Sequence, residues 1–263
     1  MLIDFHTHCF PEKIAEKAIA KLSDASGGLK NHTDGTEAGL KRSMQKNGVD
    51  ISVVLNIATN AHQQQNVNDF AASVNNEKDI FAFGSVFPDS PDALYELERI
   101  KSLGLKGVKL HPDYQRFCVD DEKMKPIYKK ISKLGLITVF HAGYDYGFAP
   151  PYGGMPRNML TALSWFDSPV IAAHWGGVNC CKEVLDLLCG QDIYFDVSFG
   201  YSMLPKYYAE KILEKHGTDK ILFGTDSPWH TAEMENRLLN SLKLTEQELK
   251  KIYCGNAKKL LNI

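Results

Sequence analysis

Short apolar runs alternate with amphipathic stretches along the whole chain. The apolar runs are rich in Ile, Val, Leu and Phe and lack the alternation of apolar and polar residues that a half-exposed sheet shows. They therefore predict buried parallel strands. Eight runs are present: LIDF at 2–5, ISVVLNI at 51–57, IFAFGSV at 80–86, LKGVKL at 105–110, LITVFH at 136–141, VIAAH at 170–174, IYFDVS at 193–198 and ILFGTD at 221–226.

The stretches between these runs carry apolar residues at helical spacing and predict amphipathic helices. Ser90 and Pro91 have the order of a helix N-cap and a first helical residue. Two segments, 23–40 and 142–157, are predicted to be loops, and the second is long enough to be a functional one. The predicted helices lie at 11–22, 90–104, 121–135, 179–190, 205–217, 232–242 and 245–262.

This order of elements predicts an α/β fold, a (β/α)8 TIM barrel. Strands that alternate with helices form parallel sheets, and barrels of this kind commonly take about 250 residues in one unit. We therefore expect a single domain over residues 1–263. A doubly wound open sheet is the alternative, but it usually carries a Gly-rich phosphate loop after its first strand, and this sequence has none there.

Composition and charge limit the kinds of binding partner that we expect. The formal net charge is -2, with 30 basic residues spread among 32 acidic ones, so a nucleic-acid partner is not expected. No apolar run approaches the roughly 20 residues that a membrane span needs. The N-terminal sequence does not have the pattern of a signal peptide, and we expect a cytoplasmic protein. For a large chain of that kind the six cysteines are expected to be free thiols.

Ionisable residues end five of the eight predicted strands. His6 and His8 are two residues apart and therefore share one face of the first strand. The C-terminal ends of barrel strands form a common rim, where active sites lie. The other strand ends contribute Lys109 and His111, His141, His174, and Asp226.

Imidazoles and a carboxylate that converge are ligands for first-row metals, and zinc is the usual occupant of such a set. A bound metal lowers the pKa of water toward roughly 7 and so activates it. Taken one at a time, a histidine could be a hydrogen-bonded core residue, Lys109 could form an ion pair, and Asp226 could be a helix N-cap. By contrast, His32, His62 and His216 are expected in loops and on helix surfaces.

The motifs at these strand ends resemble those of the amidohydrolase superfamily. More narrowly, the chain resembles the amidohydrolase-related branch (amidohydrolase 2) of TIM-barrel metal-dependent hydrolases, which also contains aminocarboxymuconate-semialdehyde decarboxylase. The resemblance covers essentially the whole chain, up to CGNAKKLL at 254–261. The motifs are HTH at 6–8, GVKLHP at 107–112, HAG at 141–143, HWGG at 174–177 and GTDSPW at 224–229.

The resemblance implies a role for each residue. His174 and Asp226 match catalytic residues that move protons. We expect one zinc ion, with a second metal bound only if Lys109 is carboxylated, as it is in relatives with two metals. The residues that match metal ligands are His6, His8, His141 and Asp226, and those predicted to contact an anionic substrate are Lys109, His111, Arg157 and Trp229, with Tyr144 and Tyr146 as pocket walls or ordinary surface aromatics.

The leading hypothesis is a metal-dependent hydrolase that uses activated water on an amide, ester or lactone of a small anionic substrate. The alternative is a metal-dependent nonoxidative decarboxylase of an unsaturated or aromatic carboxylic acid, which would use the same ligands. A metal-binding protein without catalysis is a third hypothesis. A thiol function is weaker, because Cys180 and Cys181 are not a CxxC pair and Cys9 faces away from His6 and His8. Barrels of this kind often pair, so a homodimer is a candidate state.

Overall fold

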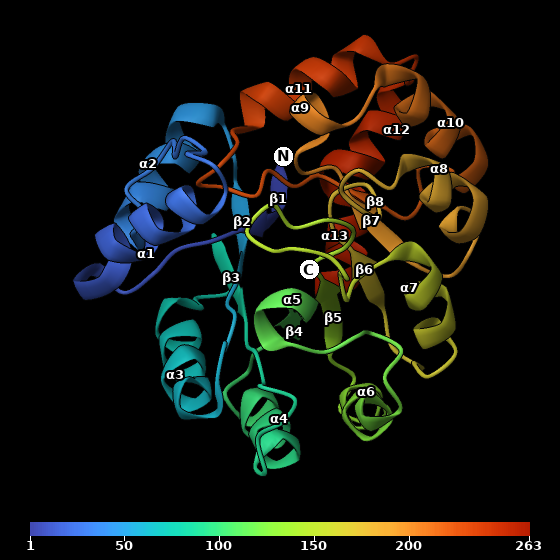
Figure 1. Cartoon of the computed structure of the whole chain (residues 1–263). Coiled ribbons are helices and arrows are strands. Elements are labelled where there is room, and N and C mark those ends of the chain that lie inside the picture. The colour runs from blue at the N-terminus through green and yellow to red at the C-terminus, as the bar shows by residue number, and fades with distance from the viewer.

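The computed structural model describes all 263 residues and contains eight parallel strands around a central axis (Figure 1). Each lies within or beside a predicted strand. Their bounds are β1 (Ile3–Thr7), β2 (Ile51–Leu55), β3 (Ile80–Phe83), β4 (Gly107–Leu110), β5 (Ile137–Phe140), β6 (Val170–Ala172), β7 (Tyr194–Asp196) and β8 (Ile221–Leu222).

The strands close into a barrel. Strands β1 to β3 pair in order, and so do β4 to β8. A bridge between Gly84 and Val108 joins the two groups on one side, and a bridge between Thr7 and Ser227 joins them on the other. The N–H of Phe5 also donates to the carbonyl of Phe223 over 2.8 Å. The predicted barrel is confirmed, and the open sheet is excluded.

Helices form a ring outside the strands (Figure 1). The predicted loop 23–40 is wrong at both ends, because α1 continues to Ala25 and α2 begins at Glu37, where the Thr36 hydroxyl caps the N–H of Gly39. Ser90 does not cap a helix, since the helix that follows starts three residues later, at Ala93. The bounds are α1 (Glu12–Ala25), α2 (Glu37–Asn47), α3 (Gln64–Val74), α4 (Ala93–Ser102), α5 (Pro112–Gln115), α6 (Lys125–Lys133), α7 (Pro156–Leu163), α8 (Cys181–Glu183), α9 (Gly200–Met203), α10 (Lys206–His216), α11 (Ala232–Ser241), α12 (Glu246–Lys250) and α13 (Asn256–Leu261), with 3₁₀ turns at Ala61–Gln63 and Glu122–Met124 and π-helical turns at Val184–Leu188 and Lys251–Gly255.

Two apolar cores hold these layers together. The larger lies between the strands and the helices, and the smaller includes the alternating residues that fill the barrel, such as Phe5 and Phe83, whose ring centroids are 5.8 Å apart. Residues Ala257 and Leu261 of α13 join this inner core. The Nζ of Lys106, just before β4, donates to the carbonyl of Leu261, so α13 lies at the N-terminal ends of the strands. The C-terminal ends of the strands, at the opposite end of the barrel, are therefore not covered by α13.

A register shift in β1 turns His6 toward the barrel axis. Phe5 already points inward, so strict alternation would direct His6 outward. The pairing with β2 shifts between Asp4 and Thr7, however, and such bulges re-aim side chains at barrel rims. The spacing of His6 and His8 predicts a shared face, but it does not show that the backbone must depart from regular pairing to bring His6 inside.

No helix of the structure is both long and apolar enough to cross a membrane. All six cysteines are free thiols, as predicted. Cys9 is a buried, packed thiol, and burial raises its pKa to about 12.

His216 was predicted to lie at the surface, but it is partly buried at the end of α10. Its ring stacks on Phe195, with 4.3 Å between centroids. Its Nε2–H donates to the carbonyl of Ile193 over 3.0 Å, and its Nδ1 accepts from the N–H of Gly190 over 3.1 Å. These bonds require a neutral ring, and burial lowers the pKa of His216 to about 4.

We expect His216 to make the protein less stable as the pH falls from about 6.5 to about 4. The ring has a pKa near 6.5 in an unfolded chain, whereas the folded protein protonates it only near pH 4. The unfolded state therefore binds more protons in this window, and acid favours unfolding by about 1–2 kcal/mol after allowance for solvent screening. Urea titrations at about pH 7 and about pH 4.5 would compare the protein with His216→Phe. An identical pH dependence in both proteins would contradict this expectation.

Candidate metal centre

The predicted rim residues come together at the C-terminal ends of the strands. Each lies within two residues of the end of its strand, except Asp226, which lies four residues beyond β8. All are buried to at least nine-tenths except His8, whose side chain is 14% exposed, and Asp226, whose side chain is 12% exposed. The cluster consists of His6 and His8 from β1, Lys109 and His111 from β4, His141 from β5, His174 from β6 and Asp226 from β8.

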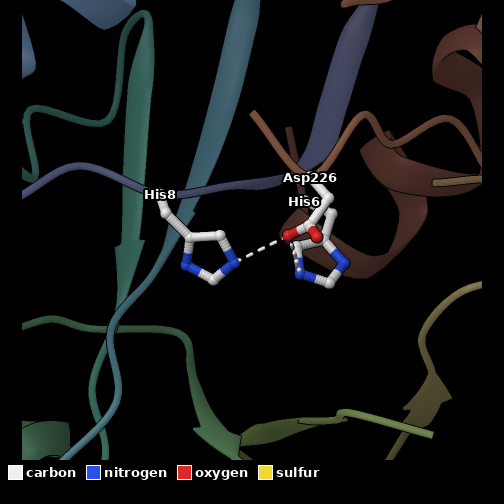
Figure 2. A group of neighbouring side chains, drawn as sticks. All are labelled: His6, His8 and Asp226. Atoms are coloured by element: carbon white, nitrogen blue, oxygen red, sulfur yellow. Dashed lines mark hydrogen bonds and ion pairs between the residues drawn. The ribbon is translucent and has the colours of Figure 1, made fainter. Parts of the chain in front are cut away.

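His6, His8 and Asp226 form one group of potential metal ligands (Figure 2). The Nε2 of His6 lies 3.1 Å from Oδ1 of Asp226, and the Nε2 of His8 lies 2.9 Å from the same oxygen. Ligand atoms about 3 Å apart can each lie about 2.0–2.2 Å from one ion.

The outer nitrogens of these two rings are fixed by acceptors. The Nδ1 of His6 donates to Oδ2 of Asp196 over 2.8 Å, and the Nδ1 of His8 donates to the carbonyl of Leu55 over 2.7 Å. With the proton on Nδ1, each neutral ring directs the lone pair of its Nε2 at Asp226. Histidine ligands of metals are commonly oriented in this way by a carboxylate or a carbonyl.

Hydrogen bonds also fix the orientation of the His141 and His174 rings. The Nε2 of His141 donates to the carbonyl of Tyr144 over 3.2 Å, and the Nδ1 of His174 lies 2.8 Å from Oγ of Ser198. Because Ser198 donates its own proton to Asp196, its oxygen accepts from His174. The remaining nitrogens, Nδ1 of His141 and Nε2 of His174, then carry no proton. Their lone pairs face each other, and the two atoms are 3.2 Å apart.

This arrangement of lone pairs and charge fits a divalent cation. Four imidazole lone pairs and one carboxylate oxygen are turned inward, and lone pairs at such short separations repel unless a positive charge lies between them. Burial alone would raise the pKa of Asp226, but the charge of His6 and His8 and their hydrogen bonds, which need a proton on each Nε2, hold it well below its usual value. A cation between these atoms would take the place of those protons and leave the rings neutral. The predicted ligands His6, His8 and Asp226 form one group, whereas His141 lies beside His174 and His111.

Asp196 and Ser198 connect the two halves of the site, and neither was predicted from the sequence. Oδ1 of Asp196 accepts from the N–H of His174 over 3.0 Å and from the N–H of Ser198 over 3.1 Å, while Oδ2 holds His6. Asp196 is fully buried. The sequence did contain a signal for these two residues. Asp196 and Ser198 are two residues apart at the end of the seventh apolar run and so share one face of the strand. Polar residues with the same spacing stand at the ends of the first and fourth runs.

Lys109 is nearly fully buried, with 1% exposure, and its Nζ lies 3.4 Å from Nε2 of His6. Burial lowers the pKa of Lys109 to about 8, against the opposing effect of Asp196 and Asp226. The pKa of Lys109 therefore lies below that of an exposed lysine, while the two nearby carboxylates favour its charged form.

His111 has both ring nitrogens engaged by the protein. Its Nδ1 accepts from the N–H of Tyr114 over 3.4 Å, and its Nε2 lies 3.2 Å from Oδ2 of Asp145. The ring stacks on that of His141, with 4.2 Å between centroids. His111 therefore braces His141 and the loop that carries Asp145, and these three residues form a further group of potential metal ligands. The substrate contact predicted for His111 stays a prediction.

Arg157 and Trp229 are placed differently. Arg157 lies on α7 at the surface, where its guanidinium, 68% exposed, pairs with Glu183, and this placement does not favour the predicted substrate contact. Trp229 is buried next to the site, and its backbone N–H donates to the carbonyl of Asp226 over 2.9 Å. Its substrate contact stays a prediction.

The loop predicted at 142–157 is shorter than predicted, because α7 begins at Pro156, and it contacts a neighbouring rim loop. A functional role for this loop stays a prediction. Gly143 pairs with Val178, and the Tyr146 hydroxyl accepts from Nδ2 of Asn179 over 2.6 Å. Tyr144 and Tyr146 are 37% and 54% exposed, which suits ordinary surface aromatics better than pocket walls.

Backbone strain is concentrated at the rim. His174 (φ 59°) and Asp226 (φ 61°) both adopt the left-handed conformation, which is costly for residues with a β-carbon. Residues in such regions cost on the order of 1–3 kcal/mol each and persist where the surrounding structure holds them for function. Asp226 is not a helix N-cap: the helix that follows, α11, is capped by Thr231.

Comparisons with known proteins agree with this architecture. The family model described as "Amidohydrolase" (Amidohydro_2) matches residues 3–263. An uncharacterised TIM-barrel protein from Bordetella bronchiseptica has a similar structure, with a TM-score of 0.79 at 18% identity over 99% of this chain and 98% of the other. A 2,6-dihydroxybenzoate decarboxylase has a TM-score of 0.75 at 16% identity over 100% and 99%. A dihydroxybenzoic acid decarboxylase from Polaromonas sp. JS666, solved with manganese and the inhibitor 2-nitroresorcinol, has a TM-score of 0.73 at 15% identity over 99% and 96%.

Proposed function

The chain belongs to the amidohydrolase family, and from this premise we propose that it is a metal-dependent nonoxidative decarboxylase of an aromatic or unsaturated carboxylic acid. The observation that carries the proposal is the similarity over the whole chain to solved structures of dihydroxybenzoate decarboxylases. It favours the decarboxylase over the hydrolase that the motifs led us to rank first. The family supports both chemistries, so the substrate must be found by assay.

The residues of the site suit the two needs of a decarboxylation. As the bond between the ring carbon and the carboxylate breaks, CO2 leaves and the electron pair stays on carbon, which must then receive a proton. The buried Lys109 ammonium would bind the substrate carboxylate. Two groups could handle the proton: Nε2 of His174, whose lone pair is inward because Ser198 accepts from Nδ1, and the carboxylate of Asp226.

A divalent cation held by His6, His8 and Asp226 would supply positive charge for the substrate's oxygens. We propose zinc, because the ligands are imidazole nitrogens with one carboxylate oxygen. Manganese is the rival, since the Polaromonas relative was solved with it. Metal analysis of the purified protein, followed by reconstitution of stripped protein with each ion, would decide between them.

The test of function is an assay of the metal-loaded protein on two panels. One panel holds 2,6-dihydroxybenzoate and related aromatic or unsaturated acids; the other holds esters, amides and lactones of similar size. We expect release of CO2 and the decarboxylated product from the first panel, with loss of this activity in Asp226→Asn. Hydrolysis of the second panel without CO2 release from the first would overturn the proposal and restore the hydrolase hypothesis.

A further inference from the structure

A serine, a histidine and a glutamate form a connected group beside the metal centre. Oγ of Ser202 lies 3.0 Å from Nε2 of His230, and Nδ1 of His230 lies 2.6 Å from Oε1 of Glu235. Ser202 is on α9, Glu235 is on α11, and His230 precedes α11; α9 and α11 lie against each other at the edge of the barrel mouth (Figure 1).

The burial of the group suits a nucleophile with its base. His230 is 4% exposed and Glu235 is fully buried, whereas Ser202 is exposed to solvent. The buried carboxylate accepts from Nδ1–H of His230, which leaves the lone pair of Nε2 to accept the serine proton. Glu235 is itself held in place, because its Oε2 accepts from the N–H of Tyr201 over 3.1 Å.

The immediate surroundings fix this geometry and leave a donor free. The ring of Phe199 packs on His230, with 4.3 Å between centroids, and so restricts the imidazole. The N–H of Ser202 itself makes no hydrogen bond within the protein, so it is free to donate to an oxygen that develops negative charge next to Oγ. Nucleophile, base and orienting carboxylate in this order are recognised by geometry and not by sequence position.

We propose that Ser202, His230 and Glu235 form a second, metal-independent site that transfers acyl groups from small, activated esters. Oγ of Ser202 attacks the carbonyl carbon, and its proton passes to Nε2 of His230. The ester C–O bond breaks, and the alcohol leaves with that proton. Water then attacks the acyl-serine, gives a proton to His230, and the carboxylic acid departs as Ser202 recovers its hydrogen. The site is separate from the ligands of the metal centre and does not rest on the decarboxylase proposal.

The test uses the zinc-loaded, full-length protein with a fluorophosphonate probe and p-nitrophenyl acetate. We expect one labelled peptide, the one that contains Ser202, and release of p-nitrophenol with an acetyl group on the same serine. Ser202→Ala should abolish both. Ser164→Ala is the matched control, since Ser164 is also exposed and bonds only a nearby carbonyl, and it should change neither.

Two further variants separate activation from a structural role of the group. Ser202→Cys keeps a nucleophile in place and should still be acylated. Glu235→Gln should slow labelling about 100-fold or more at unchanged labelling position. Labelling that Ser202→Ala leaves intact, or a rate in Glu235→Gln equal to that of the unmodified protein, would overturn the proposal and leave His230 and Glu235 as residues that fasten α9 to α11.

Discussion

Asp226→Asn is expected to lose the metal and the activity together. Oδ1 of Asp226 lies within 3.1 Å of the Nε2 atoms of both His6 and His8, so this oxygen is common to both ligand pairs. The amide has no charge to offset the cation. Loss of a partner that only orients a ligand lowers metal affinity about 10- to 100-fold, and the loss of a direct ligand should exceed that. Competition with a chelator would measure the affinity, and metal analysis would measure the content.

The control for this prediction is Asp219→Asn. Asp219 pairs with Lys251 at the surface and is 69% exposed, so its change should leave metal content and activity unaltered. Retention of full metal content by Asp226→Asn would show that the ion, if bound, sits elsewhere in the cluster.

His174→Ala separates a site with one metal from a site with two. If His174 moves protons, the variant keeps its metal and loses turnover. If it binds a second ion, the variant loses half the metal, and the role assigned to His174 is wrong. The measurement of metal content is informative at this position because the inward nitrogens of His141 and His174 are only 3.2 Å apart.

Asp196→Asn is expected to damage both stability and metal binding. Asp196 is fully buried and holds the Nδ1 of His6 through one oxygen and Ser198 and the N–H of His174 through the other. An asparagine that turns its amide toward His6 would present a donor to a donor. Loss of hydrogen bonds to a buried charged group costs roughly 1.5–3 kcal/mol each. Metal affinity should fall roughly 10- to 100-fold, because Asp196 only orients a ligand.

Urea unfolding of metal-stripped protein would measure the stability change separately from metal binding. Asp192→Asn is the matched control on the same segment: Asp192 pairs with Lys220 at the surface, is 95% exposed, and should contribute less than about 1 kcal/mol. An effect of Asp196→Asn as small as that of the control would mean that His6 does not depend on Asp196 for its orientation.

Much of the fold and part of the site could be predicted from the chain. The alternation of buried runs with amphipathic stretches predicted the strands of the barrel, since a parallel barrel requires strands that are apolar on both faces. His6, His8, His174 and Asp226 were expected at one rim, because the strands of a barrel all run in one direction. Helix boundaries were less well predicted, as at Ala25 and Glu37, because loop-like composition does not exclude a helix that packing supports.

The tertiary structure decided which of the candidate residues act together. Arg157 and Lys109 have the same formal charge in the sequence, yet one pairs at the surface with Glu183 and the other is buried beside His6. The bulge in β1, the bonds of Asp196 and the direction of each imidazole lone pair depend on contacts between residues as many as 190 positions apart. Periodicity reports which face a side chain takes within its own element, so the sequence determined the barrel and its polar rim. Only packing between elements determines hydrogen-bond partners, and these partners turn a ring of polar residues into a set of oriented ligands.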